Sequence, residues 1–386
     1  MEEARLILAA AALLLLQQPP AEKCKYCRDD PKILSAAGLV GHGPMPFGKT
    51  NSDDVKRFLS YADPLFLESA HFRIASTLEE YKIPEKDWKR MWAELNELRK
   101  LFPSIPPKLR VLDPWLRLHL YAQRCEALYT RFLDLVGNKE GDFRKTTTRP
   151  YMGEGRFLGM KDKYEVFLHK DMRAHLDLLK EHIGVSRKKP QMWHFTDRGA
   201  LTVSIPAIDD LRTDEHLHAN VAHDLGHNFV CGFRHYSFDP PVWIVEGFAH
   251  WFEREICDYD SFCSEEAAVA DMYTGTDWKA GTLRILERGK AATLADLVHK
   301  KSFNDIGRED HVIAWSKVDF LVRGVPQGFP KLLNGIKGKT DDRNLPIGTD
   351  LIGTQRDVVR AEFGWTFAEF DAEWEKWVRK AYVPQR

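Results

Sequence analysis

The chain has 386 residues, of which 44% are apolar and 29% are charged. This composition is typical of a globular protein with a large core, and it excludes a mostly disordered chain. The 56 basic and 57 acidic side chains leave a net charge of −1, and no basic cluster with interleaved aromatic residues occurs. We therefore expect no nucleic-acid partner.

The N-terminus has an apolar run, Leu6–Leu16, followed by Gln17-Gln18-Pro19-Pro20-Ala21. This pattern predicts a secretory signal peptide over residues 1–21, and hence a secreted or periplasmic protein. The run is short for a membrane span, and no later stretch of eighteen or more apolar residues occurs. We expect no membrane span after signal removal.

A cysteine-containing lead-in is predicted over residues 22–60. The chain has six cysteines, which are Cys24, Cys27, Cys125, Cys231, Cys257 and Cys263. In an oxidising compartment a local disulfide between Cys257 and Cys263 is the best single pairing. For Cys24 and Cys27 we expect a disulfide or paired thiols. The alternative is half of a zinc site, together with His42, although a second cysteine pair is missing.

The following segments alternate between strand and helix patterns. Strands are expected at 67–74, 164–168, 191–195 and 199–206, and helices at 85–101, 115–136, 170–183, 293–299, 311–322 and 367–382. This order predicts an α+β fold with the helices on one side of the strands. We divide the mature chain into a mostly helical region at 61–157 and a second domain at 158–386, with a helical C-terminal extension.

The most informative motif is His223-Asp224-Leu225-Gly226-His227, followed after eighteen residues by Glu246 in the sequence Glu-Gly-Phe-Ala. Residues four apart lie on one face of a helix, so His223 and His227 can bind the same ion. Glu246 lies in an amphipathic run that predicts a second helix. Two imidazoles and one carboxylate are a ligand set for Zn²⁺.

This arrangement resembles the gluzincin metallopeptidases, and especially the peptidase-MA-like domains of bacterial exported proteins. In the aminopeptidase-N-like branch the third ligand also follows after eighteen residues and also begins Glu-Gly-Phe-Ala. The resemblance covers about residues 160–330. It implies a zincin-like fold with a small mixed or antiparallel sheet, zinc bound by His223, His227 and Glu246, and hydrolysis of peptide bonds.

Two positions depart from the family pattern. The general base is glutamate in the family and Asp224 here, which is one methylene shorter. Many members place a tyrosine beside the oxyanion, whereas this chain has His311 where that tyrosine would align. A protonated His311 could donate the same hydrogen bond. Asp224 and His311 are therefore the predicted catalytic residues.

A peptide or protein is the expected substrate. The family's Gly-Ala-Met-Glu-Asn segment, which captures a free amino terminus, is absent from this sequence. Residues 199–206 instead predict an edge strand that pairs with an extended peptide, as in an endopeptidase. The sequence gives no indication of the oligomeric state.

Other interpretations remain open. A pseudopeptidase would bind zinc and peptide without turnover, and both departures favour it. An HD-domain phosphohydrolase would use the His223-Asp224 pair as metal ligands, but it needs a further helical histidine, and His194 lies in a predicted strand. The histidines could also be structural. His250 is expected to be a packing residue, and Glu253, with the remaining nearby histidines, a solvated or ligand-supporting residue.

Overall fold

The structure is a computed structural model that describes residues 23–143, 151–262 and 276–383. Its largest sheet has the strand order β1-β4-β5-β8-β10-β9. The bounds are β1 (Leu39–Gly41), β4 (Leu65–Ser69), β5 (Phe72–Ser76), β8 (Tyr164–His169), β9 (Gln191–Phe195) and β10 (Ala200–Pro206). The neighbours β5, β8 and β10 run parallel, and the other pairs are antiparallel. The sheet is therefore mixed.

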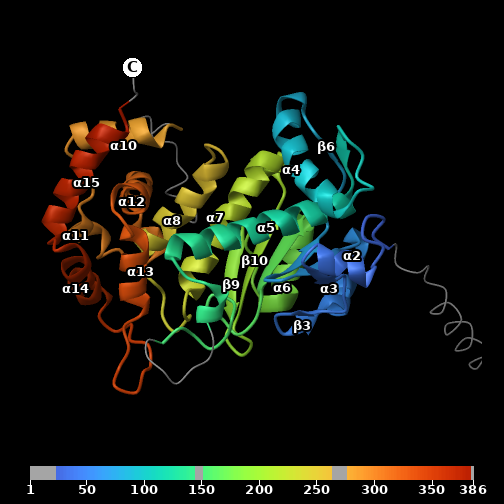
Figure 1. The fold of residues 1–386 in the computed structure, drawn as a ribbon, viewed down its shortest axis with the longest axis horizontal. Helices are drawn as coiled ribbons and strands as arrows, with labels where there is room; N and C mark the ends of the chain where they lie inside the picture. Colours follow the sequence, from blue (N-terminus) through green and yellow to red (C-terminus); the bar gives the residue numbers. More distant parts are fainter. Residues whose placement is uncertain (1–22, 144–150, 263–275, 384–386) are drawn as a thin grey trace, which may run out of the picture.

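The described part of the chain also contains helices and two small two-stranded sheets (Figure 1). The helices are α2 (Pro31–Ala36), α3 (Ser52–Phe58), α4 (Trp88–Leu101), α5 (Pro114–Val136), α6 (Met172–Ile183), α7 (Asp214–Gly232), α8 (Val242–Ile256), α10 (Trp278–Glu287), α11 (Leu294–Leu297), α12 (Arg308–Asp319), α13 (Gly328–Lys337), α14 (Leu351–Phe363) and α15 (Phe367–Ala381). The small sheets pair β2 (Pro46–Phe47) with β3 (Thr50–Asn51), and β6 (Tyr81–Lys82) with β7 (Val111–Leu112). The predicted α+β class with a helical C-terminal region is confirmed.

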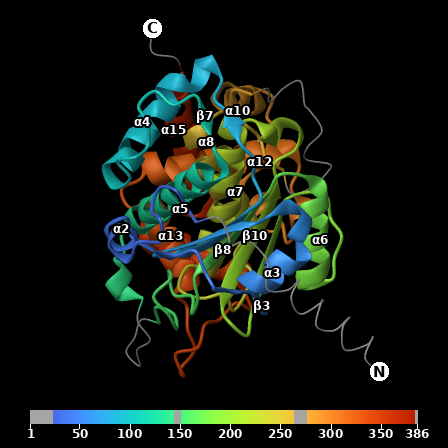
Figure 2. The same cartoon turned by 90° about the vertical axis from the view of Figure 1, so that its right-hand side faces the viewer.

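Both faces of the main sheet are covered by helices. Leu67, Ile74 and Val166 are neighbours across three strands and belong to the core that includes residues of α5 and α7. Phe66 and Phe167 point to the opposite face and pack with residues of α3 and α6. Successive strand residues face opposite sides, so the near-complete burial of β5, β8 and β10 requires two covering layers. Our prediction of helices on one side only was wrong (Figure 2).

The predicted edge strand at 199–206 is also corrected. β10 occupies this segment and lies between β8 and β9, so both of its edges are paired. The edge strand is β9, which pairs with β10 on one side only. The sheet also spans our predicted boundary at residue 157, because β5 pairs with β8.

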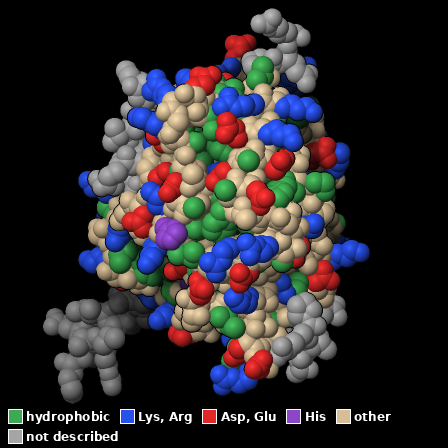
Figure 3. All heavy atoms as spheres, turned by 90° about the vertical axis from the view of Figure 1, so that its left-hand side faces the viewer, with side chains coloured by type: hydrophobic (Ala, Val, Ile, Leu, Met, Phe, Trp, Pro, Cys, Tyr) green, Lys and Arg blue, Asp and Glu red, His purple; other side chains and the backbone are tan. Residues whose placement is uncertain are grey.

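Two further observations concern the ends and surface of the molecule. The predicted signal peptide lies outside the described residues, and so does Cys263, the predicted disulfide partner of Cys257. Within the described ranges, no helix combines the length and the apolar character needed to cross a membrane. On the face viewed in Figure 3, acidic and basic side chains are interspersed.

Candidate metal centre

Helix α7 carries two of the predicted ligands and is buried along most of its length. It begins with Thr213 as its N-cap, where the hydroxyl accepts a hydrogen bond from the backbone N–H of His216 at 3.4 Å. Asp214 in the first turn complements the helix dipole. Nine and thirteen positions further along, on one face of the helix, lie His223 and His227.

Helix α8 begins directly after Pro241 and supplies Glu246. The two helices approach closely because α7 has a glycine at the crossing. A Cβ added to Gly226 would lie 3.0 Å from the Cα of Ala249, which is tighter than ordinary packing. This glycine allows the carboxylate of Glu246 to reach the two imidazoles.

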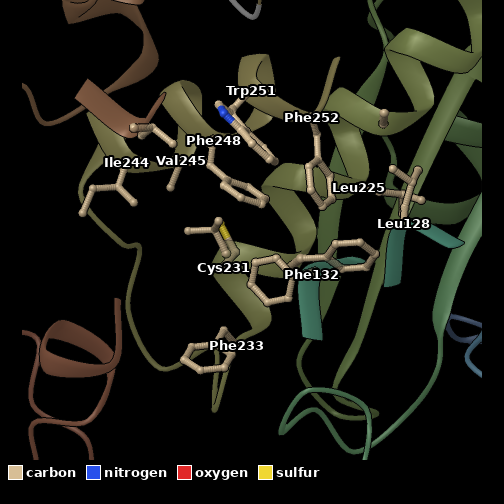
Figure 4. Packing of buried hydrophobic residues seen from close by; sticks show 14 of the residues in the cluster. Leu128, Phe132, Leu225, Cys231, Phe233, Ile244, Val245, Phe248, Trp251 and Phe252 are labelled. Atoms are coloured by element: carbon tan, nitrogen blue, oxygen red, sulfur yellow. The ribbon is translucent and has the colours of Figure 1, made fainter. Parts of the chain in front are cut away.

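A layer of aromatic side chains fixes the relative position of α5, α7 and α8 (Figure 4). The ring centroids of Phe132 and Phe248 are 5.4 Å apart, and those of Phe248 and Phe252 are 4.5 Å apart. Phe229 of α7 packs on Phe132 at 5.4 Å. Each such ring contributes about 1.5–3 kcal/mol through its burial. The ligand-bearing helices are therefore held on a rigid base.

The three predicted ligands come together. One donor atom from each of His223, His227 and Glu246 lies within 4.8 Å of the others. The Nε2 atom of His227 is 3.6 Å from Oε1 of Glu246. All three residues are buried, with exposed fractions of 1%, 3% and 0%. A single cation between these atoms would be held by two nitrogens and one oxygen.

The donor atoms lack the hydrogen bonds that buried polar atoms normally have. Within the described residues, no hydrogen-bond partner reaches Nε2 of His223, Nε2 of His227 or either carboxylate oxygen of Glu246. Burial of a polar atom without a partner costs about 1–3 kcal/mol. Several such atoms around one point fit a site whose partner is a metal ion, and the chemistry of the donor set is that of a metal site.

Three more buried residues support the ligands. Nδ1 of His223 lies 3.3 Å from Glu253 Oε2, and the same oxygen is 2.8 Å from Nδ1 of His250. Nδ1 of His311 lies 3.2 Å from Glu246 Oε2 and 3.0 Å from Nε2 of His250. Such contacts orient a metal ligand and fix its tautomer. His250 is thus both packed and part of the polar network.

Asp224 lies beside the centre with a free carboxylate oxygen. Its Oδ2 atom has no hydrogen-bond partner among the described residues, and the side chain lines a cavity that also borders His223 and His227. Burial, with the nearby negative charges of Glu253 and Glu246, raises the pKa of Asp224 to about 7. Burial lowers the pKa of His227 to about 3, so that ring is neutral and offers a lone pair.

The cavity has a volume of about 610 Å³. It is lined by the start of β9 and the segment before it, by α7 and the short helical turn before it, by the segment after α8, and by residues at and before the start of α12. The lining residues are Arg187, Lys189, Pro190, Gln191, Met192, Leu211, Asn220, His223, Asp224, His227, Tyr259, Asp260, Ser261, Phe262, Ser302, Phe303, Asn304 and Arg308. Both ligand histidines therefore face an open space. Glu246 lies behind them, fully buried.

The other predicted residues have different surroundings. His311 is fully buried and is absent from the cavity lining, so its observed contact is with Glu246. A role for His311 at the oxyanion stays a prediction. His194 lies on β9 and joins none of the possible ligand groups in the described part of the chain.

Sequence reasoning did not identify most of the cavity lining. Phe303 stacks on the ring of His227 with centroids 5.6 Å apart, and Arg308 donates to Asp260 at 2.8 Å. These residues come from segments without a motif, so nothing in the sequence marks them. The spacing of Glu253, which is three residues after His250 on the same helix, is the one signal that indicates a supporting residue.

The chain matches no protein-family model, no curated protein and no solved structure. The resemblance to the gluzincins is therefore a prediction from the motif alone. What the fold and the side chains show is a buried group of histidines and acids that could hold a metal ion beside a cavity.

Proposed function

We propose that the protein is a zinc-dependent peptidase of the endopeptidase type, with zinc held by His223, His227 and Glu246. The observation that carries this proposal is the convergence of three buried donors that lack hydrogen-bond partners, of which the two histidines line a cavity that Asp224 also lines. Two imidazoles and a carboxylate leave a fourth position for water or substrate. Bound zinc would activate water and polarise the scissile carbonyl.

The chain's own residues would bind and orient the substrate and move the proton. Asp224 is the candidate base, because its unpartnered oxygen faces the cavity and its raised pKa suits proton uptake near neutral pH. Glu253 orients His223, and His311 orients Glu246. These supporting contacts hold the ligands in place while the substrate binds.

The edge strand β9 favours a peptide as the substrate. Gln191 and Met192 of β9 line the cavity, and only one edge of this strand is paired within the described sheet. An extended peptide can add to such an edge through main-chain hydrogen bonds. This arrangement needs no free amino terminus, which agrees with endopeptidase action.

A pseudopeptidase is the second candidate. It is favoured by the shorter side chain of Asp224 and by the position of His311, which contacts Glu246 and does not line the cavity. Such a protein would bind zinc and a peptide without cleaving it. It would hold a full equivalent of zinc at this centre, and activity would appear only when Asp224 is replaced by the longer glutamate.

The test combines metal analysis with digestion of a peptide library. His227→Ala is expected to lose one zinc equivalent and all cleavage, and Asp224→Asn to keep zinc while kcat/KM falls about 10²–10⁴-fold. His299→Ala is the control, because among the described residues the exposed His299 ring bonds to the carbonyl oxygen of Ala295 in its own helix turn. Cleavage by Asp224→Glu but not by the wild type would establish the pseudopeptidase. A wild-type protein without zinc at this centre would refute both.

A further inference from the structure

The group of His223, His227 and Glu246 is called the His–Glu centre below. A second cluster of side chains that can bind a metal lies far from it in the sequence. One donor atom from each of Cys24, Cys27, His42 and His119 lies within 4.8 Å of the other three. The Sγ atom of Cys24 is 3.1 Å from Nε2 of His119, and the Sγ atom of Cys27 is 3.0 Å from Nε2 of His42. Both cysteines are fully buried as free thiols.

The distances suit four ligands around one ion. Zinc bonds of about 2.0–2.1 Å to nitrogen and about 2.3 Å to sulfur imply roughly 3.3–3.8 Å between neighbouring donor atoms of a tetrahedron. The two S···N distances fall just below this range, and the whole cluster is within 4.8 Å. Small movements of the side chains would place all four atoms at the corners of a tetrahedron. Two sulfurs and two nitrogens in this geometry are typical of zinc.

The surroundings orient the ligands as in a metal site. Nδ1 of His42 donates a hydrogen bond to the carbonyl oxygen of Phe66 at 2.7 Å, which leaves Nε2 with a lone pair toward the cluster. Zinc binds cysteine as the thiolate, and each sulfur lies beside an imidazole nitrogen, at 3.1 and 3.0 Å. The carboxylate of Asp29 is also near, with Oδ1 3.6 Å from His42 Nε2.

The backbone between the cysteines and α2 is a tight turn. Arg28 and Asp29 both have φ values of 55°, in the left-handed region that non-glycine residues rarely adopt. The N–H of Arg28 donates to the carbonyl oxygen of Cys24 at 2.8 Å, and the N–H of Asp30 to that of Cys27 at 2.9 Å. This turn brings both sulfurs within 4.8 Å of a ring nitrogen of His119 on α5, and α2 lies beside α5 in Figures 1 and 2.

We propose that Cys24, Cys27, His42 and His119 bind a second zinc ion, which has a structural role. Four protein ligands complete a tetrahedral zinc site and leave no position for substrate. Apolar and aromatic side chains surround the cluster, including Phe102, whose ring centroid is 4.7 Å from that of His119. The site is independent of the proposed peptidase activity, because it shares no residue with the His–Glu centre.

The role follows from what the ligands connect. The cysteines lie in the N-terminal turn, His42 follows β1, and His119 is in the second turn of α5. One turn and a half further along α5, the Arg124 guanidinium pairs with both carboxylate oxygens of Asp214 in α7, at 3.0 and 2.7 Å. The second zinc ion would thus fix the N-terminal segment to the helix that supports α7.

Cobalt substitution of the full chain tests the proposal directly. Only the second site has sulfur ligands, so thiolate-to-cobalt charge-transfer absorption in the near ultraviolet reports on it alone. We expect this band in the wild type and in His227→Ala, and its loss in Cys27→Ser. Cys125→Ala is the matched control, because Cys125 is a buried free thiol on the same helix as His119.

Zinc content gives the second readout. The wild type should hold two equivalents, Cys27→Ser and His227→Ala one each, and Cys125→Ala two. If Cys27→Ser does not fold, a mercurial thiol reagent added to the wild type should release one equivalent of zinc. The proposal is refuted if the cobalt-substituted wild type lacks the charge-transfer band, or if mass spectrometry finds Cys24 joined to Cys27 by a disulfide. Failure of the peptidase assay alone leaves the second site unaffected.

Discussion

The two clusters differ in how the chain assembles them. The His–Glu centre takes its donors from two consecutive helices, and His223 and His227 face a cavity. The Cys–His cluster, which consists of Cys24, Cys27, His42 and His119, joins donors up to 95 residues apart inside an apolar environment. The His–Glu centre has three donors and is open to the cavity on one side. The Cys–His cluster has four donors and no open side. In the number of donors and in their access to solvent, the two clusters differ as catalytic and structural zinc sites generally do.

The largest expected effect concerns the contact between α5, which carries His119, and α7, which carries His223 and His227. Asp214→Ala breaks the buried pair with Arg124 and leaves the guanidinium between α5 and α7 with Glu94 as its remaining carboxylate partner among the described residues. We expect a loss of about 3–5 kcal/mol in the free energy of unfolding, measured with urea. The exposed pair of Glu375 and Arg379 is the control, and Glu375→Ala should cost less than about 1 kcal/mol. Equal losses would show that the buried pair does not join the two regions.

A smaller effect concerns the packing behind the His–Glu centre. A Cβ on Gly247 would lie 2.6 Å from the carbonyl oxygen of Ala314, so Gly247→Ala must push α8 away from α12. We expect a loss of about 1–3 kcal/mol in stability and weaker metal binding at this centre alone. In Gly141→Ala the added Cβ meets open space, so thermal unfolding should be unchanged. Unchanged unfolding of Gly247→Ala would refute the packing argument.

Glu253→Gln separates the two centres by metal affinity. The substitution removes the carboxylate that orients His223, so zinc affinity at the His–Glu centre should fall about 10–100-fold. The Cys–His cluster should keep its affinity in competition with a chromogenic chelator. Glu255→Gln, which removes a partly exposed partner of Arg131, provides the control. An equal loss at both centres would indicate general destabilisation.

The smallest effect compares the ligand histidines with a buried histidine that has ordinary partners. Nε2 of His235 donates to the carbonyl oxygen of Lys337 at 2.9 Å, and Nδ1 accepts from the N–H of Ser237 at 3.3 Å. Burial and the charge of Lys337 lower the pKa of His235 to about 3. Between pH 3 and 6.5 the unfolded chain binds the proton and the folded chain does not, so stability falls with acidification.

His235→Gln should remove part of this pH dependence, at most about 1.4 kcal/mol per pH unit. The measurement is urea unfolding at several pH values with and without a chelator. The contribution of His235 should not change when metal is removed, because the residue belongs to neither cluster. If the stability of His235→Gln depended on pH as strongly as that of the wild type, His235 would not be a source of this pH dependence.

The sequence predicted the His–Glu centre because its ligands follow a helical spacing and one distant motif. It did not predict the Cys–His cluster in full. Cys24, Cys27 and His42 were considered together, but His119 lies within an amphipathic helix and has no motif around it. The sequence predicts either a disulfide or paired thiols at Cys24 and Cys27. The structure shows both as free thiols. Pairing between distant segments depends on tertiary packing, which periodicity does not encode.

The strands of the sheet were predicted better than their order. The sequence predicts strands at both β9 and β10, and it predicts β10, the more apolar of the two, at the edge. Every residue of β10 is buried, whereas four of the five residues of β9 are only partly buried. A strand buried on both faces belongs in the interior of a sheet, so composition favoured the observed order. The helices that cover the second face come from segments far apart in the sequence, and no local pattern indicates where they pack.

The separation between Cys24 and His119 has a consequence for synthesis. The two thiols leave the ribosome first, and at about 5–20 residues per second their last partner follows roughly 5–20 s later. During that interval the thiols can be oxidised to each other or kept reduced. Under the proposal of a second zinc ion, the supply of the metal and the redox state of the compartment in which the chain folds would together decide whether Cys24 and Cys27 become ligands or a disulfide.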